Sequence, residues 1–295
     1  MTIPEPPRGD TPAYRQLVAA HAAYIRGLSH RLLERVPLSP GDPAGRWVPY
    51  ALYHHIFQLC RANLALVDLG YSEEALPLGR AMISTTMNLM HIVRSANADG
   101  WALRFWLQLG DQEQRMLARE RQLQRFDPGV VERLISDSSE AARGAVEAHV
   151  AQGGIYPDKL VPSGAKKPNT HSWHGLTDRD MAMKLGLIEW YETEYDFLST
   201  MTHARAIAVL ATGQQLMRGE PLTCGPHFRA PLAALTCASN ALKYSSLVIM
   251  RHFELESVDP ECQALNLFMR EAVTAYRQDS GADDGVRAVF GRLPV

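Results

Sequence analysis

The sequence predicts an all-α protein, a multi-helix bundle of long antiparallel helices with no significant β-sheet. Apolar residues recur at three- and four-residue spacing through most of the 295-residue chain, which is the period of a helix buried on one face. No sustained alternation of apolar and polar residues with β-branched enrichment occurs, so no strand is expected. Helices of more than about 20 residues joined by short links suit antiparallel bundle packing.

Capping and breaking residues delimit the first three predicted helices. Thr11-Pro12, a capping residue followed by proline, begins the first helix, and Val36-Pro37 ends it. A second helix is expected over residues 48–69, where Gly70 stops it. Ser72 is the cap of a third helix, which is expected over residues 72–96.

The remaining helices follow the same logic. Thr177 with Asp180 resembles a capping box, in which residues at the two ends of a first turn bond to each other. This box is expected to begin a short helix that ends near Gly186 and follows the longest loop, residues 153–172. The other helices are expected at residues 101–125, 127–152, 187–218, 229–256 and 260–277.

We expect one helical domain at residues 11–280, because neither half of this region looks self-sufficient. A loose arm at residues 1–10 precedes it and a tail at residues 281–295 follows it. Hydrophobic residues make up 46% and charged residues 21% of the chain, which excludes wholesale disorder. The formal net charge of -2 provides no global attraction for nucleic acid or an anionic membrane, and a local basic patch is left open.

The compartment is predicted from what the sequence lacks. No uninterrupted apolar stretch reaches about 18 residues, so no membrane span is expected. The first residues lack the pattern of a signal peptide, and the four cysteines include no Cys-x-x-Cys pair. A cytoplasmic protein with reduced thiols is therefore expected, and homo-oligomerisation is left open.

Polar side chains gather on one face of the predicted helix 187–218. At about 100° per residue, Tyr195, Asp196, Ser199 and His203 share that face. Such groups are costly to bury unless they find hydrogen-bond partners. Asp196 and His203 lie about 10 Å apart along the helix axis, too far for direct contact. Their partners must therefore come from another helix.

The predicted helix 72–96 supplies such partners. Arg80, Ser84 and Asn88 are spaced by four residues and form a polar stripe between apolar positions. A buried arginine needs an acceptor, and Asp196 is the natural candidate for a charge-assisted pair. Two interpretations remain open at this point. The stripe is either a structural hydrogen-bond network, or a site in which Arg80 binds an anionic group and His203 transfers a proton.

Three separated sequence blocks occur in order along the chain: Arg80-x-x-x-Ser84-x-x-x-Asn88, Trp173-x-Gly175-x-x-Asp178-Arg179-x-Met181-Ala182 and Tyr195-x-x-x-Ser199-x-x-x-His203. With these blocks the chain resembles a bacterial all-helical family catalogued as domain of unknown function 5677, over about residues 50–210. The resemblance implies a helical fold and a set of key positions, but no activity. The family typically has glutamate four residues after its arginine, where this chain has Ser84, so a mechanism that needs a carboxylate there is not supported.

The predicted site combines these blocks. We expect Arg80 and His203 as catalytic or proton-transfer residues, and ligand-binding side chains at Asn88, Trp173, Asp178, Arg179, Tyr195, Asp196 and Ser199. The sequence lacks His-Glu-x-x-His, Glu-x-x-His and the glycine-rich nucleotide loops, so neither a metal nor a cofactor is expected.

Three functional hypotheses follow from this site. The first is a binding or regulatory module for a small anionic ligand. The second is a metal-independent phosphodiesterase or ribonuclease of the helical nucleotide-binding type, with His203 as acid/base and Arg80 as charge stabiliser. The third is a non-catalytic interaction scaffold whose polar network fixes helix register. Nucleic acid is not the expected partner, because acidic and basic residues alternate along the predicted helix 101–125.

Overall fold

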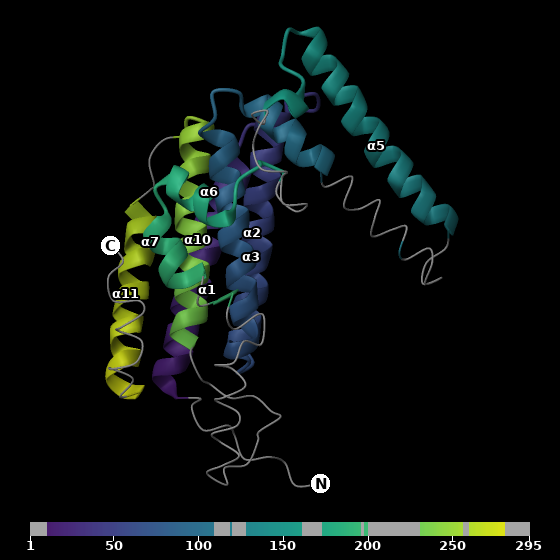
Figure 1. The fold of residues 1–295 in the computed structure, drawn as a ribbon. Helices are drawn as coiled ribbons and strands as arrows, with labels where there is room; N and C mark the ends of the chain where they lie inside the picture. The colour runs from purple at the N-terminus through teal and green to yellow at the C-terminus, as the bar shows by residue number, and fades with distance from the viewer. Residues whose placement is uncertain are drawn as a thin grey trace. The chain divides into compact units, whose positions relative to one another are not determined.

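The fold is all-α, as the sequence predicts (Figure 1). The computed structural model describes residues 11–108, 119, 128–160, 173–195, 198–199, 231–255 and 260–280. Of the described residues, 84% are helical and none forms a strand. The predicted arm at residues 1–10 and the tail at residues 281–295 lie outside this part of the chain.

Six of the described helices have 21 to 25 residues, and most helices begin and end close to the predicted positions. Residues 98–108 are also helical. The bounds are α1 Pro12–Arg35, α2 Ala44–Asp68, α3 Ser72–Val93, α5 Pro128–Ala151, η1 Pro157–Leu160, α6 Asp178–Leu185, α7 Ile188–Trp190, η2 Tyr191–Tyr195, α10 Pro231–His252 and α11 Pro260–Ser280.

Local capping explains several of these ends. The Thr11 hydroxyl accepts a hydrogen bond from the Tyr14 backbone N–H at 3.2 Å, which satisfies one of the first N–H groups of α1. Gly70 has a φ of 85°, the left-handed conformation that closes α2. The Thr177 hydroxyl accepts from the Asp180 N–H at 3.1 Å and donates to the Asp180 carboxylate at 2.7 Å. The capping interaction predicted for α6 is therefore confirmed, with the Asp180 carboxylate bound to the Thr177 hydroxyl.

Contacts group the chain into two compact units. Unit 1 comprises residues 1–37, 52–88 and 182–295, and unit 2 comprises residues 38–51 and 89–181. Three of the four boundaries fall inside helices α2, α3 and α6, and the fourth lies between α1 and α2. The expectation of a single domain at residues 11–280 stays a prediction.

The core of unit 1 is built around α10. Fifteen of the 22 residues of this helix are buried, and α1 packs along both α10 and α11 (Figure 1). Two tyrosine hydroxyls in this core are paired: the Tyr53 hydroxyl lies 3.0 Å from the Ser246 hydroxyl, and the Tyr14 hydroxyl donates to the Val67 carbonyl. Gly27 allows the close approach of α1 to α11, because a Cβ there would overlap the Leu265 side chain.

Among the described helices, α10 is the one long and apolar enough to cross a membrane by length and composition. The mean hydropathy of its most apolar window is 1.2, and 72% of that window is buried inside the protein. A helix that is apolar on all sides is also what the centre of a large helical core requires. The absence of a membrane span, expected from the sequence, stays a prediction.

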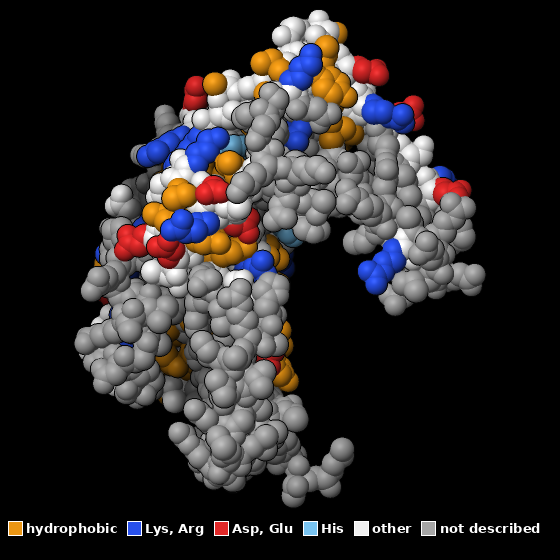
Figure 2. Space-filling model, in the orientation of Figure 1, with side chains coloured by type: hydrophobic (Ala, Val, Ile, Leu, Met, Phe, Trp, Pro, Cys, Tyr) orange, Lys and Arg blue, Asp and Glu red, His pale blue; other side chains and the backbone are white. Residues whose placement is uncertain are grey.

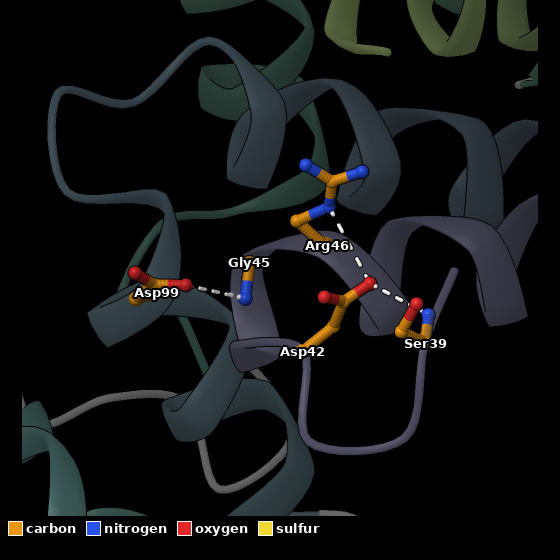
Figure 3. A network of polar contacts seen from close by, with 5 residues as sticks. All are labelled: Ser39, Asp42, Gly45, Arg46 and Asp99. Carbon is orange, nitrogen blue, oxygen red and sulfur yellow. Dashed lines mark hydrogen bonds and ion pairs between the residues drawn. The ribbon is translucent and has the colours of Figure 1, made fainter. Parts of the chain in front are cut away.

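In unit 2 the beginning of α2 is held by a residue that is distant in sequence (Figure 3). The Gly45 N–H donates to the Asp99 carboxylate at 2.7 Å, while Asp42 accepts from the Ser39 N–H at 3.0 Å and lies 3.6 Å from Arg46 Nε. Carboxylates near the first N–H groups of a helix satisfy those donors and interact favourably with the helix dipole. This tertiary cap explains why α2 begins at Ala44, four residues before the start predicted from sequence.

We predict that Asp99→Ala lowers the free energy of unfolding by about 1 kcal/mol, the usual cost of losing a capping acceptor. Asp99→Asn keeps an acceptor oxygen at the same place and is expected to lose less. Urea denaturation of both variants measures the two effects. Equal stability of Asp99→Ala and the wild type would contradict the capping role.

We also predict that protonation of His21 destabilises unit 1 in acid. His21 is 1% exposed, its Nδ1 donates to the Leu17 carbonyl at 2.9 Å, and burial lowers its pKa from 6.5 to about 4. Between these two pH values the unfolded chain binds the proton and the folded chain does not. Stability should therefore fall by about 3 kcal/mol as the pH drops through this window.

The variant His21→Phe tests this prediction, because phenylalanine keeps a ring but cannot be protonated. The pH dependence of its free energy of unfolding should be flatter than that of the wild type between pH 6.5 and 4. The control is His30→Phe, at an exposed position of the same helix. Parallel profiles for His21→Phe and the wild type would show that His21 is not the group that titrates.

Candidate functional site

Arg80 of α3 and Tyr195 of η2 meet in unit 1, although 115 positions separate them in the sequence. Arg80 Nε donates a hydrogen bond to the Tyr195 hydroxyl at 3.2 Å. The guanidinium carbon also lies 5.3 Å from the centroid of the Tyr195 ring, within the range of a cation–π contact. The structure therefore brings together two of the residues that the sequence assigns to one site.

The stripe predicted on α3 lies at the border between core and solvent. Arg80, Ser84 and Asn88 are half-buried, whereas their neighbours Ile83 and Met87 are buried. Spacing by four residues keeps the three polar side chains on one side of the helix. This side is therefore accessible to solvent along its length, and its Arg80 end contacts Tyr195.

The opposite side of the site is mostly buried. Tyr195 and Ser199 are 4% and 8% exposed, and the ring of Tyr191 stacks on that of Tyr195 with centroids 4.7 Å apart. Asp196 and His203 lie outside the described residues. The pairing of Arg80 with Asp196 and the proton-transfer role of His203 therefore stay predictions.

The helix that carries these residues is less regular than the sequence predicts. A continuous α-helix is expected from residue 187, but α7 covers only Ile188–Trp190 and η2 is a π-helical turn. Within this turn the Thr193 hydroxyl donates to the Glu189 carbonyl at 2.7 Å, a side-chain bond that competes with the regular backbone pattern. Turns of this kind hold extra residues and are frequent at functional sites. The angles calculated at 100° per residue do not apply across it.

Sequence reasoning missed Glu194, which is fully buried beneath this turn. Its side chain is 0% exposed, and the Asn240 amide donates to Glu194 Oε1 at 3.0 Å. Burial raises the pKa of the Glu194 carboxyl, and the hydrogen bond from Asn240, together with the nearby polar groups of Trp190 and Cys237, partly opposes that rise. The neutral acid is therefore favoured. A signal was present: Trp190, Glu194 and Leu198 form one row at four-residue spacing, and its other two members are apolar.

Two α10 side chains respond electrostatically to this carboxyl. Burial raises the pKa of the Cys237 thiol well above its usual value, and the nearby Glu194 raises it further. Burial and then Glu194 and Glu189 raise the pKa of Tyr244, whose ring lies 5.0 Å from that of Trp190. Both α10 groups are therefore held neutral around the Glu194 acid.

Gly79 connects this buried cluster to the arginine. A Cβ at Gly79 would lie 2.8 Å from Cys237 Sγ and 3.0 Å from Leu198 Cδ1, distances that real Cβ atoms do not adopt without a shift of their neighbours. A glycine at this position therefore lets α3 approach α10 closely. Arg80, the next residue along α3, is placed against Tyr195 by the same approach.

Three of the residues predicted to bind a ligand, Trp173, Asp178 and Arg179, belong to unit 2. Trp173 is 5% exposed and its ring centroid lies 5.5 Å from His91, 5.8 Å from Trp101 and 5.0 Å from Phe105. Arg104 fixes the same loop by donating to the Trp173 carbonyl at 2.5 Å and the Pro157 carbonyl at 3.3 Å. Trp173 is thus a core residue of an aromatic cluster within this unit.

Asp178 and Arg179, also of unit 2, are exposed at the beginning of α6. Their predicted convergence with Arg80, and that of Trp173, stay predictions. Within the described residues no group of three or more histidine, cysteine, aspartate or glutamate side chains could hold a metal ion.

A family model described as a family of unknown function, DUF5677, matches residues 46–212, more than half of the chain. The chain belongs to the DUF5677 family. No curated protein and no solved structure matches it. The part matched by the DUF5677 model contains Arg80, Glu194 and Tyr195 but not the α10 residues Cys237 and Asn240 that contact Glu194.

We predict that Glu194→Gln gains stability relative to the wild type as the pH rises above 4.5, the ordinary pKa of glutamate. Above that value the unfolded wild type loses a proton that the folded state retains, so wild-type stability falls until the raised pKa is passed. Glutamine keeps the shape and an acceptor for Asn240 but does not ionise.

The measurement is the free energy of unfolding of both proteins from pH 4 to pH 9, with Glu192→Gln, at an exposed position of the same turn, as the control. The difference between Glu194→Gln and the wild type should grow with pH and then level. A difference that stays constant over the whole range would mean that the buried carboxyl is not protonated in the folded state.

Proposed function

We propose that this DUF5677 protein binds a small anionic ligand at Arg80. The observation that carries the proposal is the double contact of Arg80 with Tyr195, through the hydroxyl at 3.2 Å and through the ring at 5.3 Å. A half-buried guanidinium is thus held in one orientation at the edge of the core. Such pre-organisation lowers the entropy lost when a ligand binds.

The chemistry of the surrounding residues favours an anion. A guanidinium remains charged at any physiological pH and offers five N–H donors in a planar fork that matches carboxylate and phosphate groups. The Tyr195 hydroxyl accepts from Nε and so orients the fork. Burial raises the pKa of Glu194, the residue before Tyr195, and this shift toward the neutral acid weakens the repulsion that the carboxyl exerts on an anion. Ser84 and Asn88 extend the same half-buried stripe with neutral hydrogen-bonding groups.

Charge distribution supports a small ligand rather than a nucleic acid. On the face drawn in Figure 2, the described lysine and arginine side chains are interspersed with aspartate and glutamate. The formal net charge of -2 and this mixed pattern of the described residues on that face differ from the clustered basic surface by which proteins bind a phosphate backbone. We therefore propose a small molecule as the bound partner rather than a membrane or a nucleic acid. The proposal also includes a cytoplasmic location for the protein.

The scaffold hypothesis accounts for one part of the same region. The contact of Glu194 with Asn240 is fully buried, and a paired polar group in a core fixes how helices align without contacting any ligand. We assign this buried pair to positioning, and we assign ligand binding to the half-buried arginine beside it. The phosphodiesterase hypothesis requires His203, which lies outside the described residues.

Calorimetric titration with inorganic phosphate, pyrophosphate and malonate tests the proposal. We predict saturable binding of at least one of these anions, weakened about tenfold or more by Arg80→Met, because the charge-assisted bonds to the ligand are lost. Tyr195→Phe keeps the ring but removes the hydroxyl, so its loss of affinity should be smaller.

The matched control is Arg61→Met. Arg61 is an exposed arginine of α2 in the same unit, and its guanidinium carbon lies 5.8 Å from the Phe57 ring centroid. This variant removes the same charge from a similar aromatic contact and should bind as the wild type does. Equal affinity of Arg80→Met and the wild type, or no saturable binding of any of the three anions, would overturn the proposed function.

A further inference from the structure

Unit 1 contains a second feature suited to a ligand, a cavity of about 200 Å³ lined by residues of α1, α10 and α11. Its inner wall is formed by buried side chains, among them Tyr24, Leu28 and Met250, which are 5%, 6% and 7% exposed. The cavity therefore offers an apolar surface that belongs to the packed core and is already formed in the absence of a ligand.

The rim of the cavity is polar. Lys243 from α10 and Gln263 and Asn266 from α11 line it, and all three side chains are exposed or half-buried. Within the described part of the chain these three side chains form no hydrogen bond or ion pair with other residues. One ammonium and two amides, contributed by two helices, thus stand beside an apolar recess.

We propose that this cavity binds a small organic monocarboxylate, with its apolar body against Leu28 and Met250 and its carboxylate at Lys243. An apolar cavity of about 150 Å³ is large enough for benzene, so about 200 Å³ admits a body of that size with a carboxylate at its edge. This volume favours a small ligand, since sites for drug-sized molecules begin at about 300 Å³. The single lysine and two neutral amides favour one negative charge.

This site is separate from the one at Arg80. Cys237, Asn240 and Tyr244 of α10 surround Glu194, whereas Lys243 and Met250 of the same helix line the cavity. At about 100° per residue the two sets point roughly a quarter turn apart around the helix axis. The inference therefore does not rest on the proposed function, and the two can fail independently.

Titration of the full-length protein with hexanoate and benzoate tests the inference, with hexanol and inorganic phosphate as comparison ligands. We expect saturable binding of at least one carboxylate, and binding of hexanol that is about tenfold weaker than that of hexanoate, because the alcohol lacks the charge-assisted bond. In protein labelled with carbon-13 at the methionine methyl groups, the Met250 signal should shift on binding, with Met250→Leu used to assign it.

A charge reversal at the rim gives the sharpest result. Lys243→Glu should lose hexanoate binding and gain binding of hexylammonium, while Lys184→Glu, at an exposed position of α6 in the same unit, should leave both unchanged. Leu247→Trp offers a second test that does not alter charge. Leu247 lines the cavity and is 39% exposed, so a larger side chain there should obstruct the cavity without disturbing the core.

Three results would overturn the inference. The first is the absence of saturable binding of hexanoate and benzoate. The second is hexanol binding as tightly as hexanoate, which would leave no role for Lys243. The third is loss of hexanoate binding in Arg80→Met with retention in Lys243→Glu, which would place the carboxylate at the first site and support the proposed function instead.

Discussion

The close approach of α3 to α10 at Gly79 is the constraint on which the candidate site depends. A side chain at Gly79 would collide with Cys237 and Leu198, so the helices reach their observed separation only because that position has no Cβ. Arg80 is the next residue along the helix. It contacts Tyr195 through a hydrogen bond to the hydroxyl and through a cation–π contact with the ring. The position of the Arg80 guanidinium is thus determined by the packing of the neighbouring residue, Gly79.

Burial shifts two ionisable groups in the core of unit 1 toward their neutral forms. His21 is buried on α1 and Glu194 is buried beneath η2, and burial shifts the pKa of each toward the neutral form. A neutral histidine has lost its proton, whereas a neutral glutamic acid has kept its own. The His21 shift therefore lowers stability as the pH falls, and the Glu194 shift lowers stability as the pH rises. Some neutral polar groups in the same core are paired, as when the Asn63 amide nitrogen donates to the Ala75 carbonyl at 3.0 Å. Burying polar residues in a low-dielectric interior costs less free energy when they are neutral and hydrogen-bonded.

Both proposed ligand sites place a cation where the core meets solvent. Arg80 lies against the ring of Tyr195, and Lys243 lies at the rim of an apolar cavity. The two cations differ in what they can recognise, because guanidinium is a planar fork with five donors and ammonium is a compact point charge. A phosphate or dicarboxylate therefore suits the first site, and a monocarboxylate with an apolar body suits the second.

Local features of the sequence determined the helices. The Thr11-Pro12 start, the Gly70 stop and the Thr177–Asp180 cap are each formed by residues close in sequence, so propensity and spacing were enough to predict them. The polar stripe at Arg80, Ser84 and Asn88 could be predicted for the same reason, because four-residue spacing defines one face of a helix.

Only the tertiary structure decided which groups those faces meet. The start of α2 at Ala44 depends on Asp99, the partner of Arg80 is Tyr195, and the burial of Glu194 depends on Asn240 and on a π turn that no spacing rule predicts. These contacts join residues that are 46 to 115 positions apart, and the free energy of each depends on the desolvation and packing of both partners. Neither quantity is encoded in the local pattern of either segment alone.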